Sequence, residues 1–403
     1  MKATTQRHCV FLTLSAVFAT ACAQTDDAAT ADAQPIALAA EPIVSIGGTD
    51  PRPEYSFDQI TGGLLLPEDQ GFVILDTRSR QVRLFGARGE HITSFGREGT
   101  GPGEFRLPIA LAPGDADSIH VWDLHQRRLT TLSVRDGGFR SSDFGQALAA
   151  LGQPLTNLQG ILRDGTLVVR HQSSQPPAEQ VADGIHRFPI DLLMLQPSGP
   201  SLNNPLGTLP GDEMFHVNLD GRSNSVPVIL GLTSPAAARG DRIAFGASEG
   251  IDLRLVDGRG DTVAVLSGGG TGRAAEQEEI DSLRNGALAA MDAPGFRNLP
   301  PAAIQGFVEP QKERIRRAPA RQVTPAFDLL RIDSDERTWV RRVGERRTDV
   351  AHWLVYDRGG ALLGVVAVPL DLQFLDARSR QLLVMRLDEM DVPTVLVYEI
   401  LWP

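Results

Sequence analysis

The chain has 403 residues, of which 42% are hydrophobic, and its formal net charge at pH 7 is −11. Binding to nucleic-acid phosphates needs a clustered positive face, so a chain this acidic is not expected to have a nucleic-acid partner. The two cysteines, Cys9 and Cys22, both lie near the N-terminus, which excludes a disulfide framework for the rest of the chain. The length is sufficient for one large hydrophobic core.

Residues 1–22 are predicted to be an export signal. They begin with a positive charge, continue with a mostly apolar segment at 10–19 that is too short to span a bilayer, and end in small residues. If Cys22 is the first residue after cleavage, it resembles a bacterial lipoprotein cysteine, which would carry lipid and tether the protein to a membrane. Cleavage after Ala21 or Ala23 without lipidation is the alternative.

The segment 23–41 is rich in Ala, Asp, Gln and Thr and is predicted to be a flexible stalk. Residues 42–403 are predicted to form the folded domain, and nothing in them is long and apolar enough to cross a membrane. The expected location is therefore outside the cytoplasm, on the periplasmic or cell-surface face of a membrane. The protein would be lipid-anchored there if Cys22 is modified.

Short runs of β-branched and aromatic residues then follow one another at Gly71–Asp76, Gln81–Phe85 and His91–Phe95. Polar or Gly-containing links separate these runs, as in β-hairpins. The next segment, Phe95–Phe105, reads FGREGTGPGEF and is soon followed by Pro108. A chain that folds back tightly from an outer strand needs backbone angles that glycine adopts most easily. The pattern predicts antiparallel strands followed by a tight return turn.

This pattern resembles the NHL repeat, in which a blade ends in an aromatic-Gly pair, crosses a Gly-rich loop and begins the next blade with Gly-Glu-Phe and a proline. The resemblance implies an all-β fold, a six-bladed β-propeller. The six predicted blades are Ile60–Phe95, Pro108–Val134, a third from Asn157, Arg242–Ser267, Phe327–Ala367 and Leu372–Ile400. The last has three strands where a blade needs four, and Pro42–Ile46 is predicted to supply the missing outer strand and so close the ring.

Residues 271–321 are predicted to be a helical insertion between blades four and five. Apolar residues recur at helical spacing over Ala274–Met291, a shorter helix is expected over Ala302–Val308, and a basic run follows from Lys312. One interpretation is a flap packed on a face of the propeller with a solvated charged edge. The other is a lid or a partner-docking element over the central channel. Deleting the insertion is expected to leave a folded propeller, because blades contact mainly their neighbours.

Three motifs suggest chemistry when read literally, and each has a simpler interpretation. The segment Gly246–Gly250 fits the G-x-S-x-G nucleophile elbow, but a strand follows where a helix is needed, so Ser248 is predicted to be a turn serine. The Gly-rich segment 268–273 is predicted to be a hinge rather than a phosphate-binding loop. His120 and His125 have a loose metal-ligand spacing and are expected to be surface histidines. No catalytic residue and no metal ligand is predicted.

Residues that lead into the innermost strands of a propeller would line the mouth of its channel. These candidates for binding are Asp58, Arg106, Asn157, Ser225 and Asp371. Calcium-dependent lactonases of propeller fold have a similar layout, in which Glu, Asn and Asp ligands meet at the axis. This set contains one Arg and no Glu, which puts a calcium centre in doubt. The alternative role is turn formation where each strand begins.

Two functions follow from these expectations. The favoured one is a non-catalytic binding or scaffold module outside the cytoplasm, tethered to a membrane, whose partner is a protein, peptide or glycan. The second is a metal-dependent hydrolase or lyase, with calcium at the mouth of the channel, and it requires several carboxylate or amide side chains that converge on the axis. Propellers host both roles, so the fold does not decide between them.

Overall fold

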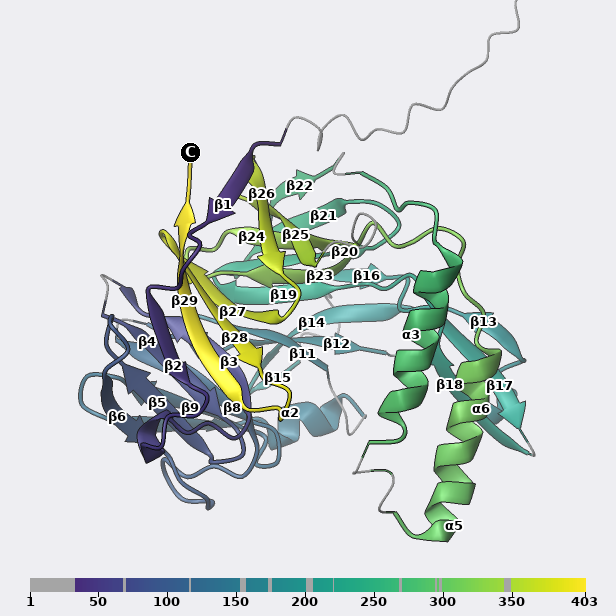
Figure 1. The fold of residues 1–403 in the computed structure, drawn as a ribbon. Helices are drawn as coiled ribbons and strands as arrows, with labels where there is room; N and C mark the ends of the chain where they lie inside the picture. Colours follow the sequence, from purple (N-terminus) through teal and green to yellow (C-terminus); the bar gives the residue numbers. More distant parts are fainter. Residues whose placement is uncertain are drawn as a thin grey trace, which may run out of the picture.

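The computed structural model describes most of the chain after the predicted signal (Figure 1). The described residues are 33–67, 70–115, 117–152, 157–172, 176–200, 206–219, 221–267, 270–293, 296, 299–343 and 349–403. Cys22 and the predicted signal at 1–22 lie outside this set. Strands dominate the described part, and none of its helices combines the length and the hydrophobicity needed to cross a bilayer.

The strands form antiparallel units in which each strand pairs with the next one along the chain. Unit 1 consists of β3 (Ile60–Leu65), β4 (Phe72–Asp76), β5 (Gln81–Phe85) and β6 (His91–Phe95). Unit 2 consists of β7 (Pro108–Pro113), β8 (Ser118–Asp123), β9 (Arg128–Ser133) and β10 (Phe139–Asp143), and helix α2 (Gly145–Ala150) follows it. The strands predicted for the first two blades are therefore present, and β10 and α2 were not predicted.

Units 3 and 4 are joined. Unit 3 contains β11 (Asn157–Leu162), β12 (Leu167–His171) and β14 (Ile190–Gln196), and both β15 (Gly199–Pro200) and β16 (Gly207–Leu209) pair with β14. Unit 4 contains β19 (Ala236–Gly240), β20 (Arg242–Ala247), β21 (Asp252–Asp257) and β22 (Thr262–Leu266). Strands β11 and β19 pair in parallel, so the two units make one nine-stranded sheet. Strand β19 was not predicted, because its sequence AAARG lacks the β-branched and aromatic residues that mark a strand.

Units 5 and 6 are bridged by the N-terminal segment. Unit 5 contains β23 (Phe327–Ile332), β24 (Thr338–Arg342), β25 (Val350–Tyr356) and β26 (Leu362–Pro369). Unit 6 contains β27 (Leu372–Arg378), β28 (Gln381–Leu387) and β29 (Pro393–Leu401), and β2 (Val44–Gly47) pairs with β29 as a fourth strand. A further strand, β1 (Pro35–Leu38), pairs with both β26 and β29.

Strand β1 corrects the prediction that 23–41 is a flexible stalk throughout. The side chain of Ile36 is only 2% exposed and belongs to a buried cluster with Val366 and Ile400. Burial of this apolar residue between two units stabilises the strand and holds the segment in place. The pairing predicted for the segment Pro42–Ile46 is present, through β2 and β29.

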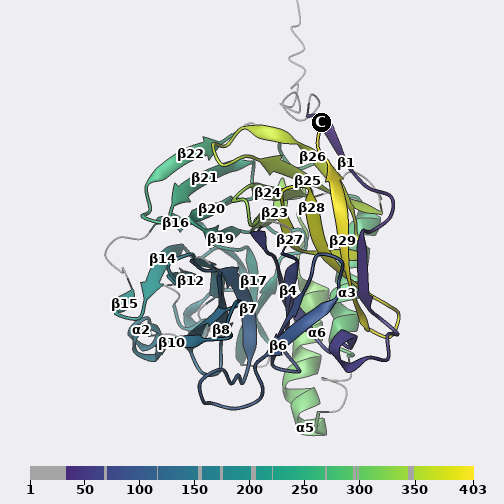
Figure 2. The ribbon, with the colours of Figure 1, turned by 90° about the vertical axis from the view of Figure 1, so that its left-hand side faces the viewer.

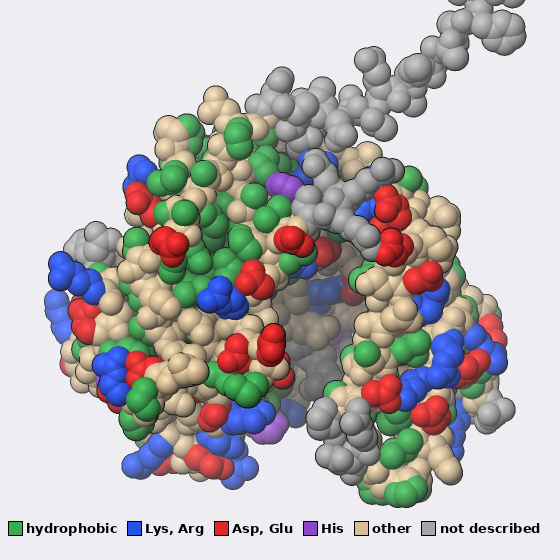
Figure 3. All heavy atoms as spheres, in the orientation of Figure 1, with side chains coloured by type: hydrophobic (Ala, Val, Ile, Leu, Met, Phe, Trp, Pro, Cys, Tyr) green, Lys and Arg blue, Asp and Glu red, His purple; other side chains and the backbone are tan. Residues whose placement is uncertain are grey.

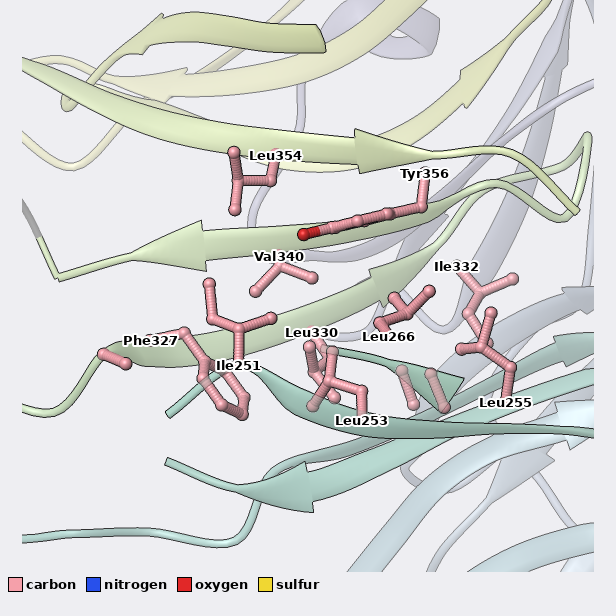
Figure 4. Close-up of a cluster of buried hydrophobic side chains, with 13 residues drawn as sticks. Ile251, Leu253, Leu255, Leu266, Phe327, Leu330, Ile332, Val340, Leu354 and Tyr356 are labelled. Atoms are coloured by element: carbon pink, nitrogen blue, oxygen red, sulfur yellow. The ribbon is translucent and has the colours of Figure 1, made fainter. Parts of the chain in front are cut away.

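Buried hydrophobic clusters lie between successive units. One joins unit 4 to unit 5, where Ile251, Leu253 and Leu255 pack against Leu330 and Val340 (Figure 4). Similar clusters join units 1 and 2, units 2 and 3, units 3 and 4, and units 5 and 6. Another contains residues of unit 6, unit 1 and β2. Figure 2 shows the units following one another around a common centre, and the arrangement is of the β-propeller type.

A separate region, the arm, is built from three segments of the chain. Its sheet consists of β13 (Gly184–His186), β17 (Met214–Leu219) and β18 (Arg222–Pro227). Strand β13 lies between β12 and β14 of unit 3, whereas β17 and β18 follow β16 and precede unit 4. Its helical part is α3 (Gln277–Ala290), α5 (Pro301–Ala303), the π-helical turn η4 (Ile304–Val308) and α6 (Glu309–Arg317). The second helical segment thus continues through the basic run, well beyond the predicted Val308.

The helices of the arm pack on the sheet of the arm. Ile280 of α3 and Ile315 of α6 are buried in one cluster with Val226 of β18. The helices predicted to form a flap on a face of the propeller therefore rest on a three-stranded sheet that was not predicted from the sequence. Figure 1 shows α3 and α6 side by side, and Figure 3 shows the surface hollowed between the arm and the propeller sheets.

Candidate functional site

Two buried aspartates fix the chain where it enters the first strands of units 1 and 2. Asp76 and Asp123 end β4 and β8, and both are 0% exposed. The amides of Asp58 and Gln59 donate to the Asp76 carboxylate at 3.1 and 3.0 Å. The amide of Arg106 donates to Asp123 in the same way at 2.6 Å. A buried carboxylate needs such donors, and these hydrogen bonds fix the turn before each innermost strand.

Four of the five predicted mouth residues lie where an innermost strand begins. Asp58 and Arg106 are exposed there, and the hydrogen bonds that anchor them come from their backbone amides. Asn157 is the first residue of β11, and Asp371 lies between β26 and β27, with its carboxylate 4.0 Å from Arg386. Among the described residues, no hydrogen bond or ion pair joins the side chains of any two of these four.

Ser225 is not at the start of an innermost strand, which corrects its prediction. It lies within β18 of the arm, and its hydroxyl is 2.9 Å from Nδ1 of His216. The prediction failed because unit 4 begins with the unrecognised strand β19, eleven residues further along the chain than Ser225.

Ser248 is a structural serine, as predicted. It is 0% exposed, and its hydroxyl accepts a hydrogen bond of 2.8 Å from the amide of Thr233, before the first strand of unit 4. This is the role that Asp76 and Asp123 have in their units. Strand β21 follows it, so the geometry of a nucleophile elbow, which needs a helix there, is not present.

The two histidines differ in exposure. His125 is exposed, as predicted, but His120 is only 5% exposed, so the prediction of a surface residue was wrong for it. The His120 ring lies within hydrogen-bonding distance of the Thr131 hydroxyl, at 3.0 Å, and of the Arg163 carbonyl, at 2.9 Å. Burial lowers the pKa of His120.

Two cavities lie at the centre of the units. The axial cavity, of about 210 Å³, is lined by residues of six strands, β3, β7, β11, β19, β23 and β27. The mouth cavity, of about 390 Å³, lies nearer the start of those strands and is lined by residues of units 1, 5 and 6. Thr61, Arg331, Phe374 and Leu375 line both cavities, so the two meet at these residues. We refer to the two cavities together as the channel.

The channel wall combines apolar side chains with Thr61, Gln159, Gln373 and three arginines. Its lining includes Arg239, Arg331 and Arg341, but no Asp, Glu, His or Lys of the described residues. The wall of the mouth cavity includes the aromatic residues Trp353 and Phe374, whose ring centroids are 5.4 Å apart. The chain as a whole has a net charge of −11, whereas the charged side chains that line the channel are all positive.

The three arginines are not equally neutralised. Arg239 forms an ion pair with Asp376, and Arg341 donates to both carboxylate oxygens of Asp328 at 2.8 and 2.9 Å. Arg331 forms no ion pair with any described residue. The Arg331 guanidinium donates one hydrogen bond in the described part of the chain, to the carbonyl of the adjacent Leu330 at 3.3 Å.

The environment of Arg331 opposes its charge but does not remove it. Arg331 is exposed to the channel, but the protein around it displaces part of the water near its guanidinium. This desolvation, and then the positive charges of Arg239 and Arg341, lower the pKa of Arg331 to about 10. At neutral pH the guanidinium is therefore protonated. The channel carries one positive charge that no described side chain neutralises.

Comparisons with known proteins do not assign the chain to a family. No family model and no curated protein matches the sequence. A protein of Bacteroides fragilis described as exported is 12% identical and aligns over 91% of this chain and 95% of its own, with a TM-score of 0.41. The calcium-binding protein regucalcin of Agrobacterium tumefaciens is 11% identical over 92% and 97%, with a TM-score of 0.36. BamB of Moraxella catarrhalis is 13% identical over 92% and 97%, with a TM-score of 0.32.

These likenesses are too distant to assign a function, so the candidate site rests on the geometry of this chain. The three channel arginines were not predicted from the sequence. The available signal was Arg331 between Leu330 and Ile332, a charged residue inside a strand predicted to be innermost. Period-two alternation did not show which way it points, because the register of β23 shifts between Phe327 and Leu329.

Proposed function

We propose that the six units are the blades of a closed propeller. Support comes from the buried cluster in which Phe72 and Phe85 of unit 1 pack with Leu383 and Val395 of unit 6. The pairing of β2 with β29 supplies the fourth strand of unit 6. The lining of the axial cavity by the first strand of every unit is consistent with a single ring. Closure of this kind protects strand edges that would otherwise be exposed.

We propose that the protein is a non-catalytic binding module outside the cytoplasm, and that the channel is its binding site. The observation that supports this most is a concave channel that combines apolar and aromatic side chains with fixed polar and charged groups, as ligand sites do. Asp58, Arg106, Asn157 and Asp371 would form its rim, and the partner would be a protein, a peptide or a glycan.

Lipidation of Cys22 would tether this module to a membrane through the segment before β1. Replacement of Cys22 by Ser is expected to move the protein from the membrane fraction to the aqueous fraction and to abolish incorporation of labelled fatty acid. A Cys9→Ser variant is the matched control, since Cys9 lies inside the predicted signal. Unchanged membrane association of Cys22→Ser would contradict the lipid anchor.

The alternative, a calcium-dependent hydrolase or lyase, finds little support in the described residues. Calcium takes about six to eight oxygen ligands, usually with several carboxylates. The described channel lining contains no carboxylate. In the described part of the chain, no group of three or more His, Cys, Asp or Glu is placed to hold a metal ion. The side chains therefore do not fit a calcium centre, and no catalytic step through calcium is derived.

The proposed function is tested by blocking the channel. Residues 23–403 would be immobilised and exposed to an envelope extract, with the wild type compared with Ala351→Trp, which fills the mouth cavity. Ala87→Trp, in the exposed link between β5 and β6, is the matched control. We expect a partner that the wild type and Ala87→Trp retain and Ala351→Trp loses. Equal retention by all three would refute the channel as the binding site, and a stoichiometric divalent ion in the purified protein would support the enzyme instead.

A further inference from the structure

We propose that the channel binds a monoanionic carboxylate with an apolar body. The carboxylate would contact Arg331, where the two cavities meet, and the apolar body would lie in the mouth cavity. This inference rests on the proposed function only in taking the channel as the binding site. It assigns the chemistry of the ligand, which neither the sequence nor the comparisons indicated.

The charge balance of the channel supports an anionic ligand. Arg239 and Arg341 already have carboxylate partners in Asp376 and Asp328, whereas Arg331 has none among the described residues. Arg331 is exposed to the channel, so its guanidinium donors are accessible to a bound anion and can form charge-assisted hydrogen bonds with it. No described lining residue is acidic, so no carboxylate of the wall competes with a ligand for Arg331.

The magnitude of the charge favours a single carboxylate over a phosphate. One unpaired guanidinium matches one negative charge, whereas a phosphate dianion would bring a second charge, and the other two channel arginines already have carboxylate partners. A guanidinium is planar and can donate two parallel hydrogen bonds to the two oxygens of a carboxylate. Arg331 lines both cavities, so its donors can be reached from the mouth cavity.

The wall beyond Arg331 determines the rest of the ligand. Trp353 and Phe374 form an aromatic wall of the mouth cavity, and Leu329, Leu372 and Met385 contribute aliphatic or thioether surface. A cavity of about 390 Å³ lies in the range that small ligands fill. The ligand is therefore a carboxylate with one aromatic or large branched group. A free organic acid and the C-terminus of a peptide that ends in a large apolar residue share this chemistry.

The test is a calorimetric titration of residues 23–403 with 3-phenylpropionate and with its neutral analogue 3-phenylpropanamide. We expect the acid to bind at least about tenfold more tightly than the amide, since a hydrogen bond to a charged group contributes that much or more. Arg331→Gln should weaken the acid by a similar factor and leave the amide unchanged. Arg135→Gln, whose side chain is 81% exposed in the β9–β10 turn, is the matched control and should bind as the wild type does.

The possible outcomes separate the inference from the proposed function. Equal binding of acid and amide, or unchanged acid binding by Arg331→Gln, would overturn the anionic ligand but keep the channel as a site. Acid binding that survives in Ala351→Trp would place the ligand elsewhere and overturn both proposals. Absence of binding by either probe at millimolar concentration would overturn the ligand class. If Arg331→Gln does not fold, the comparison of acid with amide on the wild type decides.

A second pair of probes distinguishes the two sources of the carboxylate. These are the peptide acetyl-Gly-Gly-Phe with a free C-terminus and the same peptide with a C-terminal amide. Tighter binding of the peptide acid than of 3-phenylpropionate would assign a peptide C-terminus, because the added residues then make contacts of their own. Weaker or absent binding of the peptide acid would assign a free organic acid.

Discussion

Single buried polar side chains hold the turns between the units of this protein. Asp76, Asp123 and Ser248 are all 0% exposed, and each accepts hydrogen bonds from backbone amides that precede an innermost strand. The sequence shows the 47-residue spacing between the two aspartates, but it does not show that their carboxylates accept hydrogen bonds from backbone amides. Asp58 and Arg106, which are exposed, were predicted as binding residues from the type of their side chains. A sequence shows side-chain type but does not show backbone hydrogen bonds, which are what these two residues contribute to the turns.

Replacement of Asp123 by Ala tests this role. The change leaves the amides of Arg106, Leu107 and Gln126 without their acceptor in a buried turn. We expect a loss of about 3 kcal/mol in the free energy of unfolding, measured by urea denaturation. Arg106→Ala removes only an exposed side chain of the same turn and should cost less than about 0.5 kcal/mol. Similar losses in both variants would contradict the assigned role.

His120 makes stability depend on pH. Because burial lowers its pKa in the folded state, the unfolded chain takes up the proton first when pH falls below the ordinary value of 6.5. The stability contributed by neutral His120 is therefore present above pH 6.5 and is lost as pH decreases. We expect the wild type to lose more stability than His120→Gln between pH 7.5 and 5 in thermal unfolding. Parallel pH profiles of the two proteins would disprove this assignment.

At the scale of elements, the long strands were predictable and the small-residue strand was not. The four strands of unit 5 fill the segment Phe327–Ala367 that was predicted as the fifth blade, and the last of them extends to Pro369. Strand β19 is made of Ala, Arg and Gly and forms because β11 and β20 pair with it on either side. Pairing with these two neighbours outweighs the weak strand preference of the β19 sequence. Because β19 was not predicted, Ser225 was wrongly placed at the start of unit 4.

The alternation of β2 provides an element-scale prediction. Val44 is 4% exposed and packs between units 6 and 1, whereas the adjacent Ser45 faces solvent. Val44→Asp should lower the free energy of unfolding by about 3 kcal/mol or more, because it buries an unpaired carboxylate or detaches the strand. Ser45→Asp introduces the same charge on the outer face and should change stability by less than about 0.5 kcal/mol. Equal effects would mean that β2 does not close the core between the units.

At the scale of the whole molecule, the propeller and the arm depend on different contacts. The helices of the arm share a buried cluster with β18. Ala274, where the chain leaves unit 4, forms a β-bridge with Val323, where the chain enters unit 5. The helical insertion was predicted from its spacing. The sheet beneath it was not, because β13 has only three residues and the sequence RSNSVP of β18 is mostly polar and resembles a loop.

This arrangement refines the expected result of deleting the insertion. A chain in which 276–318 are replaced by a Gly/Ser linker keeps Arg321, which pairs with the buried Glu213 at 2.9 Å. The propeller should still melt cooperatively, while the uncovered side chains of Val226 and Ile229 should bind a hydrophobic dye and promote self-association. Adding Val226→Thr and Ile229→Thr should reduce both effects. Loss of cooperative melting would instead show that the helices belong to the core of the propeller.

The pairing of β1 with β29 places Ala37 opposite Leu401 and Leu38 opposite Ile400. The two ends of the folded chain are therefore neighbours (Figure 1). A short peptide could join them, and the chain could be cut again in an exposed link between two units, with every strand pair retained. Such circular permutants would differ from the natural chain in the order of synthesis but not in architecture, so the choice of which unit comes first is not imposed by the fold.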